Sequence, residues 1–495
     1  MRSHCPFVAL AILTAVAAPV RGQTWIGPGP DWNTAADWTP AVIPNSPTAT
    51  PSFTGNDLGP VNISASVQSQ SLTFSNASGA YTLTSNAGVT LSGLTGVTVG
   101  TQVTGLETIN LASVAAGSLV FTGGSPTVAN LSTASAATLV IGPGTVLGSA
   151  NHVGLTFTGT GVTQITGSFA SSVNTVTGGL VKSGQGTLVL GGNGVSLTGV
   201  LALTGGTLQL DYSANSAAKL GAGGSLSLLG GQLVLVANTT TAITQTIANG
   251  TAVSAGHTDL LAQSAGGGTI TLGLGGVGRL AGATLDVNTG AGSPAFSAAT
   301  SNGNINSLLA NAALTSSAFA TVGGGATWAT ASGGNVAGLS AGGYAANTFT
   351  TNTNVDVTAS AAPAAFTANS LRFNTTPAVT LTLTGVNTLQ SGGILVTPSA
   401  NNGGTITGGF LTAPSSGELL VHQYSPSNFT INSQLISSAG LTKTGPGTLT
   451  LGGDNTLLLT GPVNVNRGNL SVTTAAAVNA ASQINFNDAR GGGPA

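Results

Sequence analysis

The chain has 495 residues and a formal net charge of −2, with 75 glycines, 4% charged residues and 4% aromatic residues. An average soluble protein has about 25% charged residues, so this composition excludes an ordinary globular surface. The mean hydropathy of +0.37 and the small net charge exclude typical disorder, and the nine basic residues are too few and too scattered for a nucleic-acid-binding surface. A chain of this length normally forms several domains, but a repeat architecture escapes the size limit on a single core.

Residues 1–22 are typical of a secretory signal peptide. Arg2 is followed by an apolar run from Phe7 to Val20 and then by small and polar residues, which predicts cleavage near Gly22. The run is too short for a typical membrane-spanning helix, and no later apolar stretch reaches about 18 residues, so we expect no transmembrane helix. The only cysteine, Cys5, precedes the run. The exported chain is therefore expected to have no disulfide and no thiolate metal site.

Three of the four tryptophans, Trp25, Trp32 and Trp38, lie in the segment 23–58. We interpret this segment as a small N-terminal cap whose rings close the open end of the structure that follows. The alternative is that these rings form a stacking platform for sugar, which makes them the candidate binding residues of the sequence. The fourth tryptophan, Trp328, is isolated.

From about Pro60 the chain consists of short apolar alternations separated by Gly, Asn and Ser, as in "QSLTFSNASGAYTLTSNAG". Alternation of Leu, Val and Ile with Thr or Ser predicts short half-buried strands at roughly ten-residue spacing. Glycine and β-branched residues at this frequency disfavour helices. Two Ala-rich pieces, 307–322 and 361–371, are the least strand-like, and we expect loops or short helical excursions there.

The scarcity of charge helps to choose among β architectures. In a parallel β-helix, equivalent side chains of successive coils lie about 4.8 Å apart. Two like charges at this separation repel by about 0.9 kcal/mol even in water, whereas Thr, Ser and Asn stack on themselves by hydrogen bonding. A β-sandwich has no comparable reason to lose its charges. We therefore predict an all-β fold, a parallel β-helix (β-solenoid) over residues 59–472, with roughly 20 coils.

Two distant glycine-rich segments nearly repeat each other: "GLVKSGQGTLVLGG" at 179–192 and "GLTKTGPGTLTLGG" at 440–453. A phosphate-binding loop needs its lysine directly after a glycine and before a helix. Lys182 and Lys443 instead precede their glycines, and a strand is expected to follow. The segments predict a strand, a tight turn and a second strand, with the lysine in a structural position at the edge of the turn.

These segments resemble the autotransporter-associated β-strand repeat of bacterial surface proteins, whose consensus is similar to "GLTKxGxGTLTLSGxNTYTGxTTVNxGTL". The resemblance covers residues 179–210 and 440–472 and includes a later glycine in each copy, Gly206 and Gly468. It implies a parallel β-helix passenger at the bacterial cell surface or outer membrane. It also implies a secreted or surface-located adhesin or structural component, with carbohydrate or other cell-surface ligands as partners.

The sequence departs from this family at two points. The family usually has an aromatic residue where this chain has the segments 195–197 and 457–459. Its passengers are usually exported by a C-terminal β-barrel, but only 23 residues follow Val472. We therefore expect either another export route or a piece of a longer protein, in which residues 473–495 form an incomplete coil or tail.

A search for an active site gives two weak candidates among acidic residues that are strewn singly along the chain. "HTD" places His257 and Asp259 on one face of a strand, for which a chance surface pair is the simpler interpretation. "GELLVHQY" places Glu418, His422 and Tyr424 on one strand face. Glu418 and His422 would lie about 13 Å apart along that strand, too far for a direct acid and base pair. We predict no catalytic residue, no metal site and no cofactor.

The sequence thus favours a secreted, non-enzymatic β-solenoid that acts as a structural or adhesive component at the cell surface. One alternative is a β-helical carbohydrate-active enzyme, either a polysaccharide lyase or a hydrolase. A third hypothesis is ice binding, because flat Thr-x-Thr ranks can order water. The oligomeric state stays open.

Overall fold

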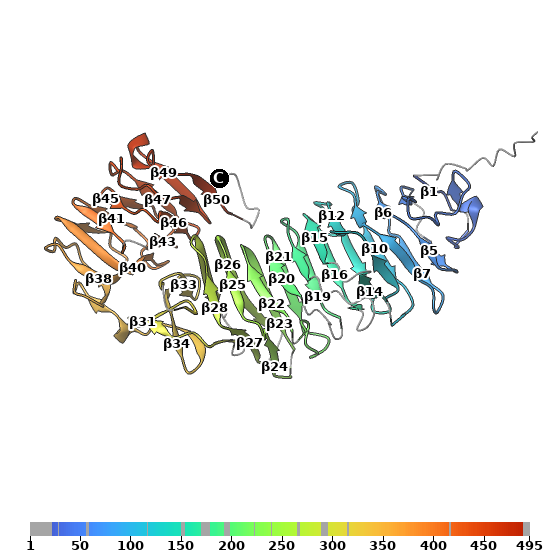
Figure 1. Ribbon diagram of the computed structural model, residues 1–495, viewed down its shortest axis with the longest axis horizontal. Coiled ribbons are helices and arrows are strands. Elements are labelled where there is room, and N and C mark those ends of the chain that lie inside the picture. Colours follow the sequence, from blue (N-terminus) through green and yellow to red (C-terminus); the bar gives the residue numbers. More distant parts are fainter. Residues whose placement is uncertain are drawn as a thin grey trace, which may run out of the picture.

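Stacked parallel strands make up most of the chain (Figure 1). The computed structural model describes residues 22–488, apart from residues 28, 56–58, 116, 150–153, 170–178, 193–198, 222, 239, 265–267, 289–295, 314–315 and 415–416. It is all-β, with about 2% helix, and forms a β-solenoid of about 17 turns with a tryptophan cluster near the N-terminus. The predicted parallel β-helix with a Trp-containing cap is confirmed. The predicted signal peptide, except Gly22, and the departing segment 195–197 lie outside the described residues.

Three sheets form the walls of the first solenoid. A twelve-stranded sheet consists, in spatial order, of β2 (Trp38–Thr39), β1 (Thr24–Trp25), β3 (Ser52–Phe53), β6 (Ser71–Phe74), β9 (Gly96–Val99), β12 (Thr127–Asn130), β15 (Leu155–Gly159), β18 (Leu180–Lys182), β20 (Val200–Leu203), β22 (Ser225–Leu228), β25 (Thr251–Val253) and β28 (Val277–Arg279). A five-stranded sheet consists of β17 (Ser168–Phe169), β14 (Val146–Ser149), β11 (Leu119–Phe121), β8 (Leu91–Leu94) and β5 (Val67–Gln68).

The third wall is a sixteen-stranded sheet. It consists of β24 (Ile243–Thr246), β27 (Ile270–Gly275), β30 (Phe296–Thr300), β35 (Asn335–Gly338), β34 (Thr327–Ser332), β33 (Ala320–Val322), β29 (Ala283–Asn288), β26 (Gly256–Ser264), β23 (Gly231–Ala237), β21 (Thr207–Asp211), β19 (Thr187–Leu190), β16 (Val162–Ile165), β13 (Thr138–Ile141), β10 (Leu106–Asn110), β7 (Thr82–Ser85) and β4 (Pro60–Ile63). Short 3-10 helices are present at η1 (Ala35–Asp37), η3 (Ala341–Gly343) and η4 (Ala475–Ala477). None of the helices in the described part of the chain has the length and hydropathy needed to span a bilayer.

The second solenoid begins after a break in the first. Its ten-stranded sheet consists of β36 (Ala345–Ala346), β37 (Asn354–Val357), β38 (Thr367–Phe373), β40 (Val386–Val396), β43 (Leu419–Gln423), β46 (Leu441–Thr444), β48 (Val463–Val465) and β50 (Ile484–Phe486), with β42 (Phe410–Thr412) and β45 (Gln434–Ile436) beside this path. A five-stranded sheet faces it, formed by β39 (Val379–Thr382), β41 (Gly404–Thr407), β44 (Phe429–Ile431), β47 (Thr448–Leu451) and β49 (Asn469–Val472).

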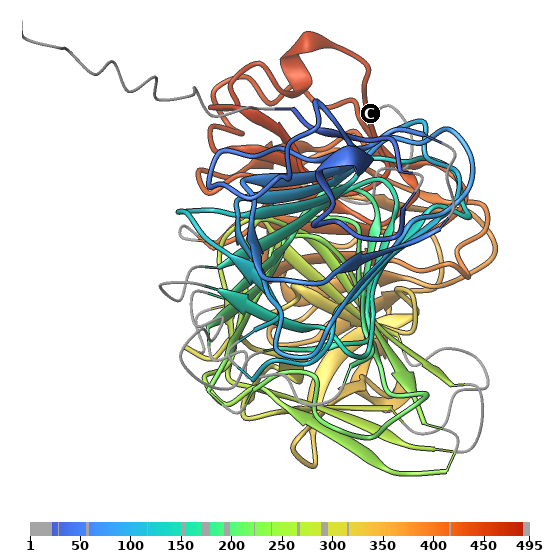
Figure 2. The same cartoon turned by 90° about the vertical axis from the view of Figure 1, so that its right-hand side faces the viewer.

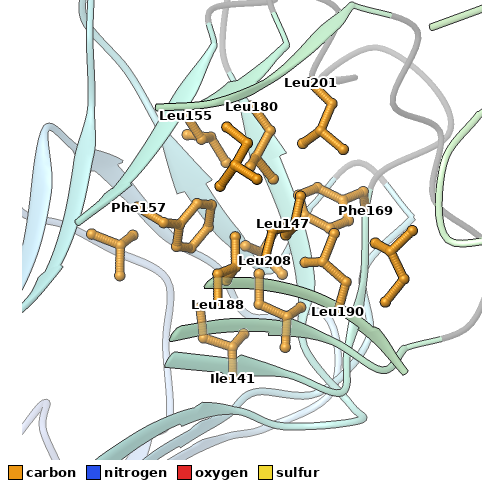
Figure 3. Close-up of a cluster of buried hydrophobic side chains, with 14 of the residues drawn as sticks. Ile141, Leu147, Leu155, Phe157, Phe169, Leu180, Leu188, Leu190, Leu201 and Leu208 are labelled. Atoms are coloured by element: carbon orange, nitrogen blue, oxygen red, sulfur yellow. The ribbon is translucent and has the colours of Figure 1, made fainter. Parts of the chain in front are cut away.

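Rows of aliphatic side chains fill the interior in register. Leu155, Leu180 and Leu201 are paired on neighbouring strands and are 0% to 3% exposed, and Figure 3 shows them as one row inside the coil. Leu188 and Leu208 form a second paired row on the opposite wall. Burial of each leucine stabilises the fold by about 2 kcal/mol. The period-2 pattern of the sequence therefore builds a continuous core without any helix to cover it.

The break between the solenoids is the main departure from the sequence analysis, which treated residues 59–472 as one rod. A hairpin of β31 (Asn304–Ile305) and β32 (Leu308–Leu309) and the antiparallel strands β33 to β35 interrupt the parallel stacking. Among its described residues, the Ala-rich piece 307–322 is mostly loop and turn, as expected, and contains the short strands β32 and β33, whereas the piece 361–371 runs from a loop into the start of β38. The short strands in these pieces were not expected, because tertiary pairing and not local propensity decides the conformation of small residues.

The second solenoid folds back against the end of the first. Figure 1 shows the red strands around β50 beside the green strands β26 and β28, and Figure 2, viewed along the rod, shows the blue cap in front of the coils. Asn466 Nδ2 donates to the carbonyl of Gly282 at 2.7 Å, although the two residues are 184 positions apart. The strand β50 pairs in parallel with β48, within the segment expected to be an incomplete coil or tail.

Candidate functional site

The three clustered tryptophans form the interior of the N-terminal cap. Trp25, Trp32 and Trp38 are 3%, 0% and 1% exposed, and their indoles pack edge to face, with ring centroids 4.9 to 5.0 Å apart. Trp38 Nε1 donates to the carbonyl of Trp32 at 2.8 Å. Phe53 continues the cluster and stacks on Phe74 of the next coil at 5.4 Å. The burial favours the cap interpretation, and sugar binding by these rings stays a prediction.

The repeated lysines lie inside their coils. Lys182 Nζ donates to the carbonyls of Ser183, Gly184 and Gly205, at 2.6, 3.0 and 3.2 Å. The residue is only 2% exposed and joins the predicted strand β18 to the tight turn before β19. An ammonium group has three donors and no acceptor, so three turn carbonyls satisfy it completely.

The second copy repeats this arrangement. Lys443 Nζ donates to the carbonyls of Gly445, Gly447 and Arg467, at 2.5 to 2.6 Å. Burial lowers the pKa of Lys182 to about 8 and that of Lys443 to about 7. We call each lysine with its three carbonyls a lysine cage. Both cages link one coil to the next, which supports the structural interpretation, although the lysines are buried rather than placed at an edge.

The two weak active-site candidates meet at the junction of the solenoids. His257 Nε2 lies 3.0 Å from Asp259 Oδ1, and His257 Nδ1 lies 3.1 Å from Thr284 Oγ1. The ring of Tyr424, from the second solenoid, lies 6.5 Å from the ring of His257. His257 and Asp259 are 3% and 5% exposed. The interpretation as a surface pair is wrong, because the second solenoid covers them.

An ion pair and its hydrogen bonds hold the two solenoids together. Arg279 Nη2 donates to Glu418 Oε1, and both side chains are more than 90% buried. Gly282 N donates to the same carboxylate at 3.1 and 3.2 Å. Thr442 Oγ1 donates to Glu418 Oε2 at 2.6 Å. The carboxylate is therefore fully paired, as a buried charge must be. We call this set of groups the junction clasp.

An apolar cluster lies beside the clasp. His422 packs edge to face against Trp328, with ring centroids 5.1 Å apart, and both residues are 0% exposed. Burial lowers the pKa of His422 to about 3, and the charges of His257 and Arg279 act in the same direction. Glu418 and His422 thus have different partners, consistent with their predicted separation along β43.

The junction also contains the only like-charged pair in register among the described strands. Asp259 of β26 is paired with Asp286 of β29. Arg467 Nη1 from the second solenoid lies 3.8 Å from Asp259 Oδ2. Asp286 accepts hydrogen bonds from Thr321 Oγ1 at 2.7 Å and from Gly325 N at 3.0 Å. In the described strands, stacked like charges therefore occur only where the second solenoid and a tight turn supply compensating donors.

Thr284, His257 and Asp259 follow the order of a nucleophile, a base and an acid, but they are already committed to structural contacts. Thr284 is 0% exposed, donates to the carbonyl of Gly256 at 3.3 Å and lies 3.2 Å from Asn466 Nδ2. A substrate carbonyl has no path to this hydroxyl. Within the described residues, no group of three or more His, Cys, Asp and Glu side chains is placed to hold a metal ion.

Sequence reasoning singled out one motif on each side of the junction but did not predict that they meet, and it missed the other residues that join them. The strands of the two candidate motifs were recognised, but their meeting depends on the break between the solenoids, which has no signal in the alternation pattern. The junction residues that the sequence did not indicate are Arg279, which pairs with Glu418, and Thr284, Asp286, Thr321, Trp328, Asn466 and Arg467.

Comparison of the chain with known protein families, with curated proteins and with solved structures finds no match.

Proposed function

We propose that the protein is a secreted, non-enzymatic β-solenoid of the autotransporter-associated repeat type, acting as a structural or adhesive component at the bacterial cell surface. The β-solenoid fold is consistent with a structural or surface protein. Chemically capable side chains, among them Lys182, Lys443, His257 and Glu418, are engaged in holding coils together. Because these side chains are used inside the solenoids, the outer faces are the surfaces left for contact with partners.

One outer face carries the adhesive proposal. On the five-stranded sheet of the second solenoid, register places five hydroxyl side chains in one line: Thr380, Thr405, Thr430, Thr450 and Ser471. All are half-buried or exposed. A parallel rank contains Thr382 and Thr407. We call these residues the threonine face. It carries no charge in its two ranks, and adjacent strands place its hydroxyls about 4.8 Å apart.

A face of this kind suits weak contacts that act together. Each hydroxyl contributes little alone, but contacts on successive coils are linked, so their effective concentration is high and avidity exceeds any single affinity. A hydroxyl-rich polymer such as a cell-surface polysaccharide offers matching donors and acceptors along its length. Because each coil presents an equivalent hydroxyl group, successive coils can contact successive units of such a polymer.

Lysine substitutions test the face directly. The double variant Thr405→Lys and Thr430→Lys places two stacked charges in the rank, and we expect loss of attachment to polysaccharide-coated surfaces in a surface-binding assay. The matched control is Thr187→Lys with Thr207→Lys, also paired threonines on adjacent coils but on the sixteen-stranded sheet of the first solenoid. Equal attachment of both variants and the unaltered protein would contradict the proposal.

The main competing function is a carbohydrate-active β-helical enzyme. Exposure of the exported protein to neutral and acidic polysaccharides, followed by measurement of released reducing sugar and of unsaturated lyase products, distinguishes the two. We expect no turnover. Robust release of sugar would replace the adhesive proposal with an enzymatic one.

Ice binding is a second candidate, favoured by the two ranks of the threonine face. Thr380 and Thr382, and Thr405 and Thr407 on the next coil, form two aligned T-x-T pairs. A thermal-hysteresis assay tests this function, with the same lysine variant as the control that should abolish the effect.

A further inference from the structure

A pocket of about 530 Å³ with a mixed polar and apolar lining lies at the junction of the two solenoids. Its described walls come from the end of β28, the connecting segment after β30, strand β40 and the chain that leads into β43. The volume is within the range typical of small-molecule sites, which occur preferentially between structural units. The polar residues of the lining include Arg279, Asn311, Ser317, Gln390, Ser391 and Glu418.

The polar groups of the pocket are held in place by contacts outside it. Gln390 Oε1 accepts a hydrogen bond from Asn352 N at 2.7 Å, which orients its amide group. Ser391 Oγ donates to the carbonyl of Asn369 at 2.7 Å. Arg279 Nε donates to the carbonyl of Ala283 at 3.2 Å, and Glu418 is fixed by the junction clasp. A site whose groups are already ordered loses little conformational entropy when a ligand binds.

The charges in the lining define the ligand class. Arg279 and Glu418 are the charged residues among the described lining, and they pair with each other, so the pocket has no net charge. A charged ligand would leave one charge uncompensated in a partly buried site. The other polar groups are amides and hydroxyls, which both donate and accept hydrogen bonds. Leu420 and Pro414 add apolar surface.

These properties match a ligand with adjacent hydroxyl groups on an apolar ring. The hydroxyl groups of such a ligand accept from the side-chain amide of Gln390 and exchange hydrogen bonds with the serine hydroxyls of the lining, while the Arg279 and Glu418 pair stays intact. We propose that this pocket binds an uncharged saccharide of one or two rings, which contacts both solenoids. This site is separate from the threonine face and goes beyond the adhesive function proposed from it.

Variants that fill or alter the pocket without disturbing the clasp test the proposal. Ala281 is exposed and lines the pocket, so Ala281→Trp blocks it, whereas Gln390→Ala removes one amide. The matched control is Ala252→Trp, at another exposed alanine, on the neighbouring strand β25. The probes are cellobiose, lactose, maltose and N,N′-diacetylchitobiose, with digalacturonate as the charged comparison. Binding is measured by calorimetry on the whole exported chain and by the rise in Tm that a ligand of the native state causes.

We expect saturable binding of at least one neutral disaccharide, weakened at least about tenfold by Ala281→Trp and by Gln390→Ala and unchanged by Ala252→Trp, a change of about 1.4 kcal/mol. Absence of binding for all four neutral probes, equal binding by the blocked variant, or preference for digalacturonate would overturn the proposal. Attachment through the threonine face is scored separately. Its persistence in Ala281→Trp or its loss in the Thr405→Lys and Thr430→Lys variant therefore tests the adhesive function and not the pocket.

Discussion

Lys443 and Gly468 lie on successive coils so close together that a Cβ atom on Gly468 would be 2.6 Å from Lys443 Nζ. Gly468 also has a φ of +68°, a left-handed conformation that disfavours other residues. Lys182 and Gly206 repeat the relationship, with 2.7 Å and +64°. The lysine and the later glycine of the two repeats are therefore one structural unit, because the ammonium group and the neighbouring turn carbonyls together occupy the space that a side chain on the glycine would need.

Replacement of a caged lysine should destabilise its solenoid. Lys182→Met leaves the carbonyls of Ser183, Gly184 and Gly205 without their donor, and buried unsatisfied carbonyls cost about 1 to 3 kcal/mol each. Since removal of a buried charge offsets part of this cost, we expect a loss of about 2 to 4 kcal/mol in the free energy of unfolding. Urea denaturation measures it. Gln185→Met, at an exposed position of the same turn, is the control, and an equal effect of both variants would contradict the cage.

A methyl group on Gly468 should be worse than the backbone conformation alone explains. Gly468→Ala adds about 1 to 2 kcal/mol of backbone strain. Its methyl group also meets Lys443 Nζ and the carbonyl oxygens of Gly445 and Pro446, which disturbs the lysine cage. Gly88 has a similar φ of +77° but open space around its Cβ position, so Gly88→Ala reports the strain alone. We expect the Tm of Gly468→Ala to fall at least twice as far as that of Gly88→Ala. Similar falls would mean that the lysine cage as a whole does not restrict this position.

Acid should weaken the junction through His422. Its pKa is about 3 in the folded protein and about 6.5 in the unfolded chain, so the unfolded chain binds the proton first as the pH falls. The stabilisation is complete above about pH 6.5 and is lost progressively toward pH 3. Between pH 7 and pH 4.5 the loss is about 2 to 3 kcal/mol relative to a variant without this group.

The comparison uses His422→Phe, which keeps a ring against Trp328. Carboxylates elsewhere titrate equally in both proteins, so the difference between their unfolding free energies reports His422 together with its coupling to His257. A difference that does not change with pH would show that His422 is not buried in its neutral form.

Loss of the ion pair should separate the solenoids before either unfolds. Glu418→Gln leaves Arg279 buried without its counter-charge, and breaking a buried pair in this way costs about 3 to 5 kcal/mol. We expect a larger maximum dimension in small-angle X-ray scattering. Glu107→Gln also removes a buried carboxylate, but one within the first solenoid, and should leave the dimension unchanged. An unchanged dimension in both variants would contradict the role of the clasp.

Deletion of residues 24–53 should expose the end of the first solenoid. The deletion removes Phe53 from the ring of Phe74, together with the three indoles that pack on Phe53, and it leaves β6 as an edge strand paired only with β9. We expect aggregation and faster proteolysis, measured by light scattering and limited trypsin or elastase digestion. A soluble, protease-resistant rod that has lost only sugar binding would instead support the stacking-platform alternative for the tryptophans.

The fold was largely predictable because it rests on repetition. Alternation such as that around Leu180 and Leu201 predicts strands, and the lack of charge predicts coils in register, since like side chains then stack. The Asp259 and Asp286 pair shows why like charges are avoided at stacked positions. These two stacked carboxylates need Arg467 and the donors of a turn to compensate their repulsion. Among the described strands, stacked like charges occur at this pair alone, where contacts with protein groups replace water around the carboxylates.

The junction was not predictable from the sequence. Residues 257–286 and 418–467 are separated by a break whose Ala-rich sequence has no period, so nothing local indicates that the second solenoid returns to the first. Likewise, the alternation around Glu418 predicts the face of the strand on which this side chain lies, but it does not predict that Arg279 pairs with it. Contacts between residues 139 positions apart, such as Arg279 and Glu418, depend on the path of the whole chain.

The most direct test of in-register coil stacking is the distance between residues of the threonine face. No cysteine follows residue 5 in the sequence, so spin labels can be placed on the cysteine pairs Thr405→Cys with Thr430→Cys, Thr380→Cys with Thr430→Cys, and Thr380→Cys with Thr450→Cys. Continuous-wave EPR should show label separations that grow by about 4.8 Å for each coil, with the strongest broadening in the first pair and the weakest in the third. Broadening that does not follow this order would contradict the stacking, and with it the threonine face.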